Sequence, residues 1–445
     1  MPEIDILPPR KTIHRPLGPI PHDESSNAGN LAILENIFRG QYHLPDCAFE
    51  KRLYLVYGDQ KTIQRLRTIK RRRRESEKPF DRLQWILPVP ALFHLKMNLL
   101  YMISKAHFGG QDGDQSSLYD AMNFWGRKRI TQTKSEFHAL EELVIHSYKA
   151  RIVAFFWRHM ELPSVLGGQQ MEDGLERVLK SLGFSTLVDL LDRISSQYSY
   201  NRNVGIAEDG ELRSHALFLR HAQTYLLLKY GIKHGDIGLI RRAVDRCIVY
   251  FHGSGQSNYA YEMLYLQRLL VNSTPELRKS ILSNSLVNLR GLSNTWFEMD
   301  RLVEFHNGNM KNLFHARRGS TINLEQLFKN YALSSAYITN LGDDIYQIFN
   351  LRKNNEHTNK SAQRDIVAMA QRLSIASVRF KAGRTVRYPA IDTAAIGSLR
   401  IASDALPKFN SIDCLQGFSE IKAEALAEEE NSHDGNIRDF FVLEE

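Results

Sequence analysis

The feature that most restricts the fold of this chain is the scarcity of strand-like segments. Two candidates stand out, residues 51–58 and residues 83–92, and both lie near the N-terminus. The second contains Pro88 and Pro90, so it should be an edge strand or stop early, because proline cannot donate to a sheet ladder. Most of the remaining sequence has apolar residues at helical spacing. This pattern predicts an α/β protein that is predominantly helical, with a small mixed sheet and a large helical insertion.

Composition suggests how the 445 residues are divided. Residues 1–44 are rich in Pro, Gly, Asn and Ser, which predicts an extended segment, and the pattern LAILENIF from Leu31 could form one or two helical turns. Residues 45–330 form the expected core domain, which holds the sheet and the helical insertion. Residues 331–378 are expected to form a helical extension, and residues 379–445 a poorly ordered acidic tail. With 43% hydrophobic residues, the chain can bury a sizeable core.

The three cysteines are far apart in the sequence, which is typical of a reducing compartment rather than of a disulfide framework. No run of about 18 apolar residues is present, so we expect no membrane span. The N-terminus also lacks the charged and apolar regions of a signal peptide. Together these features predict an intracellular protein.

Charge is concentrated in two places. Residues 61–78, named here the basic arm, carry nine basic and two acidic side chains, whereas residues 420–445 carry nine acidic and two basic ones. A dense cationic block neutralises phosphates and releases counterions, which predicts sequence-independent binding of nucleic acid. The run KRRRR is also typical of a nuclear-import signal, and the simpler alternative is a solvated helix end. The candidate nucleic-acid-binding residues are Arg67, Lys70, Arg71, Arg72, Arg73 and Arg74.

Two acidic residues are candidates for a metal site. Asp59 follows the first predicted strand, and Glu262 lies in a largely apolar helical pattern, where a carboxylate is costly unless paired. Carboxylates of this kind can hold Mg²⁺ or Mn²⁺ for phosphodiester attack. The alternatives are a helix cap for Asp59 and a helix-surface position for Glu262. A polar stripe that includes Asp300 and Glu304 at helical spacing could likewise line a site or form an exposed face.

Several motifs together resemble a known family. They are YGDQKTIQRLRTIKRRR at 57–73, FDRLQWILPVPALFHLKMNLLYMI at 80–103, EFHALEELVIHSYKA at 136–150, GSGQSNYAYEMLYL at 253–266 and LSNSLVNLRGLSNTWFEMDRLVEFHNGNMK at 282–311. This run, in order over roughly residues 10–330, is similar to the fungal family catalogued as domain of unknown function 6589. The resemblance implies an origin in a mobile element and a transposon-derived protein.

Transposases of the ribonuclease-H-like class set the expectation for catalysis. They place one aspartate at the end of the first strand, a second after a later strand, and a glutamate on a helix. Asp59 matches the first position and Glu262 is the candidate for the last. No carboxylate follows the second predicted strand, and Asp112 or Asp114 could substitute only if that strand is displaced.

Two hypotheses follow from this pattern. The first is a nucleic-acid-binding protein with a metal-dependent nuclease or transposase-like core, which is degenerate if the second acid is missing. The second is a non-catalytic helical scaffold or interaction protein, in which the same motifs are core and turn positions.

Overall fold

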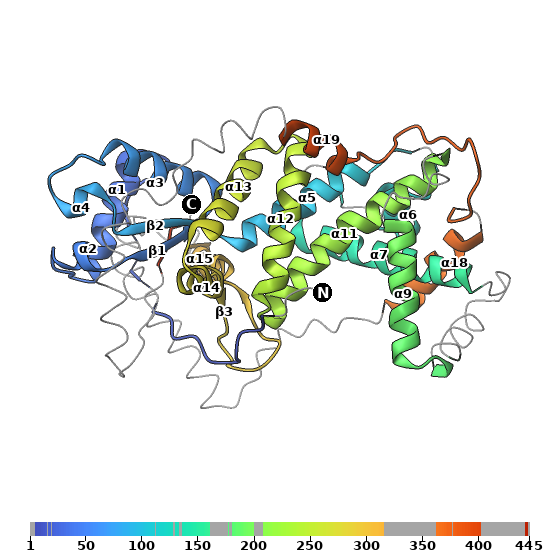
Figure 1. Cartoon of the computed structure of the whole chain (residues 1–445), viewed down its shortest axis with the longest axis horizontal. Helices are drawn as coiled ribbons and strands as arrows, with labels where there is room; N and C mark the ends of the chain where they lie inside the picture. Colours follow the sequence, from blue (N-terminus) through green and yellow to red (C-terminus); the bar gives the residue numbers. More distant parts are fainter. Residues whose placement is uncertain are drawn as a thin grey trace.

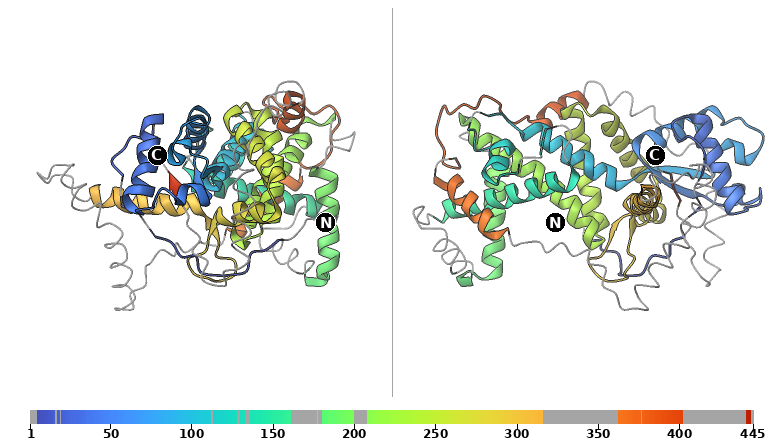
Figure 2. Two further views of the ribbon diagram at one scale, coloured as in Figure 1. Left: turned by 60° about the vertical axis from the view of Figure 1, so that its left-hand side comes forward. Right: turned by 180° about the vertical axis from the view of Figure 1, so that it is seen from behind.

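The computed structural model describes residues 5–160, 177, 180–199, 208–315, 362–401 and 441–443, with gaps at 16, 19, 112, 128–129, 133–135 and 376. This part of the chain is predominantly helical, as predicted. A small α/β lobe lies at one end of the molecule, and a helical body forms the rest (Figures 1 and 2).

The lobe is built around two parallel strands. Strand β1 (Tyr54–Gly58) pairs with β2 (Ile86–Pro90) in the register Tyr54↔Ile86 to Gly58↔Pro90. Helices α3 (Gln60–Arg72) and α4 (Pro79–Arg82) connect them. A third strand, β5 (Phe441–Leu443), pairs in parallel with the other side of β1, which gives the order β2-β1-β5. The described sheet is therefore parallel, and the prediction of a mixed sheet is wrong for these strands. The prediction that its prolines would keep the second strand at an edge of the sheet is therefore confirmed for the described strands.

Each face of β1 and β2 packs into a different core. Tyr54, Val56 and Ile86 belong to an aromatic core that also contains Phe38, Phe49, Phe80 and Trp85. Leu55, Tyr57, Leu87 and Val89 point the other way, into the core of the helical body. This division follows from the alternation of side chains along a strand. All ten strand residues are buried, which explains the apolar runs in the sequence.

Long helices make up the body. They are α5 (Leu92–His107), α7 (Phe137–His159), α11 (Gly210–His234), α12 (Ile237–Ser254), α13 (Ser257–Asn272) and α15 (Met299–His315). Shorter elements complete it: α6 (Leu118–Phe124), α9 (Phe184–Ser199), α14 (Pro275–Asn284), β3 (Leu286–Val287), β4 (Phe297–Glu298), α18 (Gln363–Ile375) and α19 (Thr393–Arg400). Strands β3 and β4 form a separate antiparallel pair.

The N-terminal segment differs from the expectation of an extended chain through residue 44. Its first part is extended, and Leu7 N–H donates to the carbonyl of Gly235. Helix α1 (Asn27–Glu35) and π-helix η1 (Asn36–Gln41) follow. The side chain of Ser26 caps α1 by accepting from the Gly29 N–H, so a serine expected in an extended segment begins a helix instead.

Residues 379–401 of the expected poorly ordered tail are folded onto the helical body, while residues 402–440 lie outside the described residues. Helix α19 packs closely against α12, because glycines meet at the crossing. A Cβ atom at Gly253 would lie 1.8 Å from the Thr393 carbonyl oxygen, and one at Gly397 would lie 1.9 Å from that of Val249. The two helices can approach this closely because Gly253 and Gly397 have no side chains. A search for apolar residues at helical spacing does not detect such glycines. Residues 331–361 of the predicted helical extension lie outside the described residues, and α18 follows them.

Candidate functional site

Asp59 lies directly after β1 and begins α3. Its side chain accepts a hydrogen bond of 2.7 Å from the backbone N–H of Thr62, and its backbone is extended, as in an N-cap residue. The strand end and the carboxylate are therefore where the sequence places them. In this structure the carboxylate serves as a helix cap, and its role as a metal ligand stays a prediction.

Glu262 lies on α13 and is only 2% exposed. Its carboxylate accepts from both terminal nitrogens of the Arg67 guanidinium, at 2.7 Å for the Nη1–Oε2 pair, and the Arg67 guanidinium lies 4.2 Å from the centre of the Tyr265 ring. A buried carboxylate requires such a partner. A member of the basic arm thus faces inward and joins α3 to α13.

The two candidate acids have different hydrogen-bond partners in the structure, Thr62 N–H for Asp59 and Arg67 for Glu262. Asp59 precedes Arg67 by eight residues, or about 12 Å along the axis of α3, and Glu262 lies at Arg67. Within the described ranges, no three His, Cys, Asp or Glu side chains are arranged to hold a metal ion. The binding of Mg²⁺ or Mn²⁺ by Asp59 and Glu262 therefore stays a prediction.

A buried carboxylate from α15 contacts the start of α5, the helix that follows β2. Both carboxylate oxygens of Asp300 accept from the Phe93 N–H, at 3.0 and 2.9 Å. The backbone N of His94 lies 3.2 Å from Oδ2, and its Nδ1 lies 3.1 Å from the same oxygen. Asp300 is fully buried and caps the first turn of α5, whose N-cap residue Ala91 has no side-chain oxygen.

These groups lie at the edge of the sheet where β1 and β2 end. The Ala91 N–H donates to the Gly58 carbonyl at 3.0 Å, so the first turn of α5 lies beside Asp59 at this edge. His94 Nε2 lies 3.9 Å from Oε1 of Glu304, a partly exposed residue one turn after Asp300. We name His94, Asp300 and Glu304 the carboxyl-edge cluster. Ligands of parallel sheets commonly bind at such an edge.

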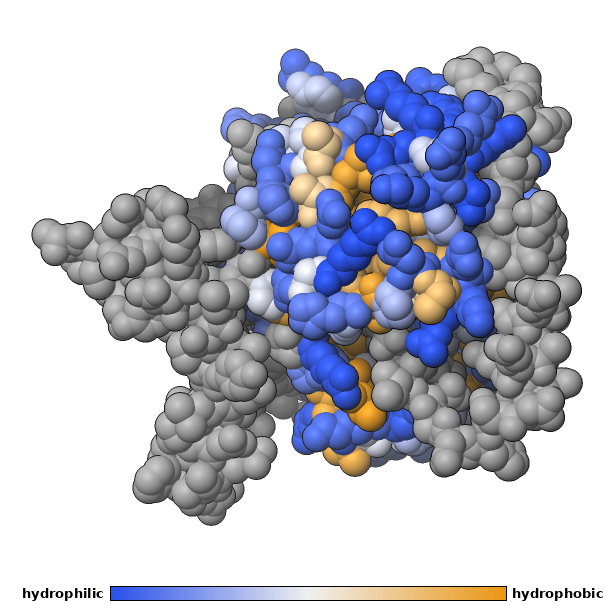
Figure 3. Space-filling view, turned by 90° about the vertical axis from the view of Figure 1, so that its left-hand side faces the viewer, coloured by the Kyte–Doolittle hydropathy of each residue, from blue (hydrophilic) through white to orange (hydrophobic). Residues whose placement is uncertain are grey.

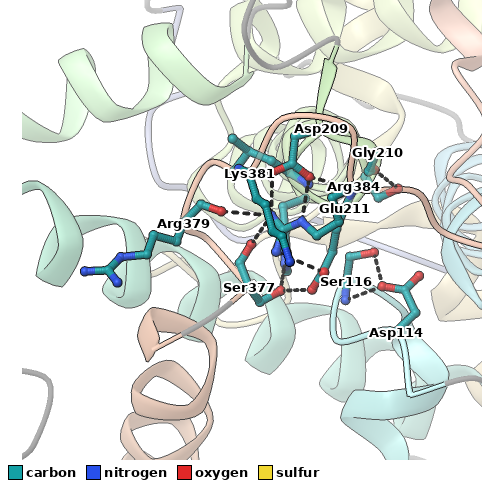
Figure 4. Close-up of polar contacts among 12 residues, drawn as sticks. Asp114, Ser116, Asp209, Gly210, Glu211, Ser377, Arg379, Lys381 and Arg384 are labelled. Carbon is teal, nitrogen blue, oxygen red and sulfur yellow. Dashed lines mark hydrogen bonds and ion pairs between the residues drawn. The ribbon is translucent and has the colours of Figure 1, made fainter.

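Asp114, the proposed substitute for the second acid, is not part of this cluster. Its carboxylate accepts from the backbone N–H of Ser116 at 2.8 Å and from the hydroxyl at 2.7 Å, in the loop before α6 (Figure 4). The strand has not shifted, because β2 ends at Pro90, within the predicted range. Asp112, the other substitute, lies outside the described residues.

The basic arm is divided into inward and outward side chains. Besides Arg67, Lys70 faces inward, where its Nζ donates to the Ile86 carbonyl at 2.6 Å, and burial lowers the pKa of its ammonium to about 7. Arg73 forms an ion pair with Asp81 at 3.1 Å. Of the six candidate residues, the three that remain exposed are Arg71, Arg72 and Arg74, named here the exposed basic patch. The periodicity of α3 places Lys70 and Arg73 on the face of Leu66. It does not separate the inward Arg67 from the exposed Arg71 and Arg74, which share one face by the same spacing.

Figure 3 shows the lobe end-on, and hydrophilic residues cover most of its described surface. The exposed basic patch belongs to the last turn of α3 and the turn after it. Cations at the carboxyl end of a helix also interact favourably with the helix dipole. The patch is therefore a stable surface feature whether or not it binds a ligand.

A second polar cluster lies in the helical body, where the chain returns to the start of α11 (Figure 4). The carboxylate of Asp209 is fully buried and accepts from Nε and Nη2 of Arg384 at 2.8 and 2.6 Å. The backbone N–H groups of Leu212 and Lys381 also donate to it. These hydrogen bonds hold the pKa of Asp209 below its ordinary value despite burial. Because these donors occupy both carboxylate oxygens of Asp209, the cluster holds residues 377–384 against the start of α11 and leaves no open site.

Buried histidines continue this polar network. His107 Nε2 lies 2.8 Å from His221 Nδ1, and His221 Nε2 lies 2.9 Å from the hydroxyl of Thr393. Arg151 Nε donates to His215 Nδ1 at 3.1 Å, so His215 is neutral and donates from Nε2 to the Ser377 hydroxyl at 2.6 Å. Burial, with nearby arginines, lowers the pKa of His107 and His215 well below 6.5, and that of His221 to about 3. All three imidazoles are therefore uncharged near neutral pH.

The described elements define a predominantly helical protein with a small parallel sheet at one end. The chain belongs to the family of unknown function DUF6589, whose family model matches residues 1–357. The family predicted from the sequence motifs is thus confirmed. No curated protein and no solved structure matches the chain. In the described part of the chain, no helix has the length and apolar character needed to cross a membrane.

Proposed function

We propose that this protein binds nucleic acid through the exposed basic patch. One observation carries the proposal: Arg71, Arg72 and Arg74 are exposed, while neighbouring basic residues on the same helix are fixed to the protein interior. Arg67 holds α3 to α13, and Lys70 holds it to β2. A guanidinium group on a fixed backbone loses less conformational entropy when it binds a phosphate than one on a mobile segment. The same arginines are proposed to serve as a nuclear-import signal.

Contacts of this kind are made to the phosphate backbone and carry no base specificity. Each phosphate neutralised by an arginine releases counterions, so the affinity should fall steeply as salt is added. The competing proposal is a helical scaffold whose patch is only solvated. It predicts no binding to nucleic acid even at low salt.

The first test replaces all three arginines of the patch in the variant R71Q/R72Q/R74Q. If each contacts one phosphate of a DNA duplex, the slope of log K against log salt becomes shallower by about 2.7. The affinity at 0.1 M salt then falls by up to about 500-fold. The measurement is a salt series of fluorescence-anisotropy titrations on a duplex of random sequence.

A matched control removes the same charge elsewhere. The variant R213Q/K279Q/R379Q changes three exposed basic residues outside the lobe. It should keep both the slope and most of the affinity. Equal losses in the two triple variants would mean that only net charge matters, and an absence of binding by the unchanged protein would favour the scaffold.

We further propose, as the catalytic half of this function, a transposon-derived metal-dependent nuclease core of ribonuclease-H-like type. The placement of Asp59, His94, Asp300 and Glu304 at one edge of the sheet supports it. Asp300 orients the His94 imidazole through Nδ1, which directs Nε2 toward Glu304. Asp59 at the end of β1 would bind Mg²⁺ or Mn²⁺, and Glu304 beside His94 is proposed as the second carboxylate. Glu262 would have to leave Arg67 before it could contribute.

The test of catalysis is the nicking of a supercoiled plasmid in Mn²⁺ or Mg²⁺. The substitution Asp59→Asn suits this test because asparagine remains a good N-cap for α3 but removes the carboxylate charge. We expect metal-dependent nicking by the unchanged protein and none by D59N or E304Q. If neither the unchanged protein nor D59N cuts the plasmid, the catalytic half is wrong and the binding proposal stands alone.

A further inference from the structure

Ser76 lies in the linker between α3 and α4, just beyond the exposed basic patch. The linker is neither helix nor strand, and its turn is closed by the Ser76 N–H, which donates to the Arg73 carbonyl at 3.0 Å. Ser76 is partly exposed, and its hydroxyl makes no hydrogen bond with a described residue. A short segment held by so few hydrogen bonds opens locally at little cost in free energy.

Two arginines shortly before Ser76 suit recognition by an acidic enzyme cleft, and Glu75 and Glu77 flank the serine directly. Arg74 precedes the serine by two positions and is exposed. Arg73 precedes it by three and is held only by the pair with Asp81, whose side chains are 41% and 38% exposed. Exposed ion pairs of this kind contribute little to stability. Both arginine side chains can therefore pair with carboxylates of another protein at little cost in free energy. Kinases select substrates by such charge patterns, and guanidinium–carboxylate pairs are geometrically specific.

We propose that Ser76 is a phosphorylation site for an arginine-directed serine/threonine kinase. We propose also that its phosphate binds arginines of the exposed basic patch and so prevents them from binding nucleic acid. The Ser76 Oγ attacks the γ-phosphorus of ATP, the bond from that phosphorus to the β–γ bridging oxygen breaks, and ADP leaves. The hydroxyl proton passes to the catalytic aspartate of the kinase. The second half of this inference rests on the proposed binding of nucleic acid.

The expected effect of the modification follows from charge and proximity. A phosphoserine carries about −1.5 to −2 charges at pH 7 and three acceptor oxygens. Arg72 and Arg74 lie four and two residues away in the sequence, so they can bind this phosphate in place of a nucleic-acid phosphate. For each arginine that turns to the phosphoserine, the affinity for nucleic acid should fall roughly eightfold at 0.1 M salt.

The experiment treats the full chain with a purified arginine-directed kinase and ATP, and locates the phosphate by mass spectrometry of proteolytic peptides. Phosphate should appear at Ser76, and incorporation there should be slower in R74Q. The substitution Ser76→Ala should remove this signal. Ser25→Ala is the matched control, because Ser25 is exposed but has Asp23 and His22, and no arginine, two and three positions before it, and it should leave the signal intact.

The two halves are tested separately. A chain that stays unmodified at Ser76, while the same kinase modifies a control peptide, overturns the site. A modified chain that binds duplex DNA as tightly as the unmodified chain overturns the regulation. If the unmodified chain binds no nucleic acid, the proposed function fails, and the mass-spectrometric result alone decides whether Ser76 is a modification site.

Discussion

Replacing Arg67 with methionine is expected to lower the free energy of unfolding by about 3–5 kcal/mol, because the buried carboxylate of Glu262 loses its partner. Glu262 accepts from both terminal nitrogens of Arg67, and no more than 3% of its side chain is exposed to water. The measurement is urea unfolding followed by circular dichroism. The effect should be large because this pair also connects the α/β lobe to the helical body.

Two further variants separate the ion pair from side-chain packing. The double variant R67M/E262M removes both charges, and it should recover most of the loss, since replacing a buried pair with apolar residues is often close to neutral. Arg71→Met, four residues further along α3 and exposed, should change the free energy of unfolding by less than about 0.5 kcal/mol. If Arg67→Met behaves like Arg71→Met, the buried pair does not hold the two parts together.

Acid should destabilise the protein steeply through His107, His215 and His221. Above pH 6.5 these imidazoles are neutral in both the folded and unfolded chain, so they add no pH dependence. Below pH 6.5 the unfolded chain binds a proton at each, while the folded chain does not because burial lowers the three pKa values. Stability therefore falls as the pH falls, by a slope that approaches about 4 kcal/mol per pH unit below about pH 5.5.

Proton uptake on unfolding provides the measurement. Calorimetry at pH 5 in buffers of different ionisation enthalpy should detect nearly three protons from these groups beyond the contribution of the carboxylates. His215→Gln should reduce the uptake by one proton, whereas His22→Gln, at an exposed position, should leave it unchanged. An uptake that is the same in His215→Gln as in the unchanged protein would show that the buried imidazole is already protonated when folded.

Local pattern predicted the α/β lobe well. The strand–helix–strand order follows from the apolar runs around Tyr54–Gly58 and Ile86–Pro90, and the helix between them from Ile63, Leu66 and Ile69 on one face. Asp59 was predictable as a residue at a strand end, because its neighbours in the sequence define that end. The side-chain partners of these elements were not predictable in the same way.

The contacts that define the candidate site connect residues far apart in the sequence. Asp300 contacts His94 across 206 positions, and Glu262 contacts Arg67 across 195. Sequence periodicity places each of these residues on a helix face but does not identify the facing helix. The sequence therefore predicted that Glu262 needs a partner without revealing Arg67, and it did not show that Asp300 caps the helix after β2.

The two-sided burial of β1 limits which changes this protein can accept. Tyr54 and Leu55 are consecutive, yet one belongs to the aromatic core and the other to the core of the helical body. Inserting or deleting a single residue within the strand would invert its alternation and send every following side chain to the opposite side. Natural variation in this strand should therefore consist of replacements by apolar residues of similar volume, with changes in length confined to the loops.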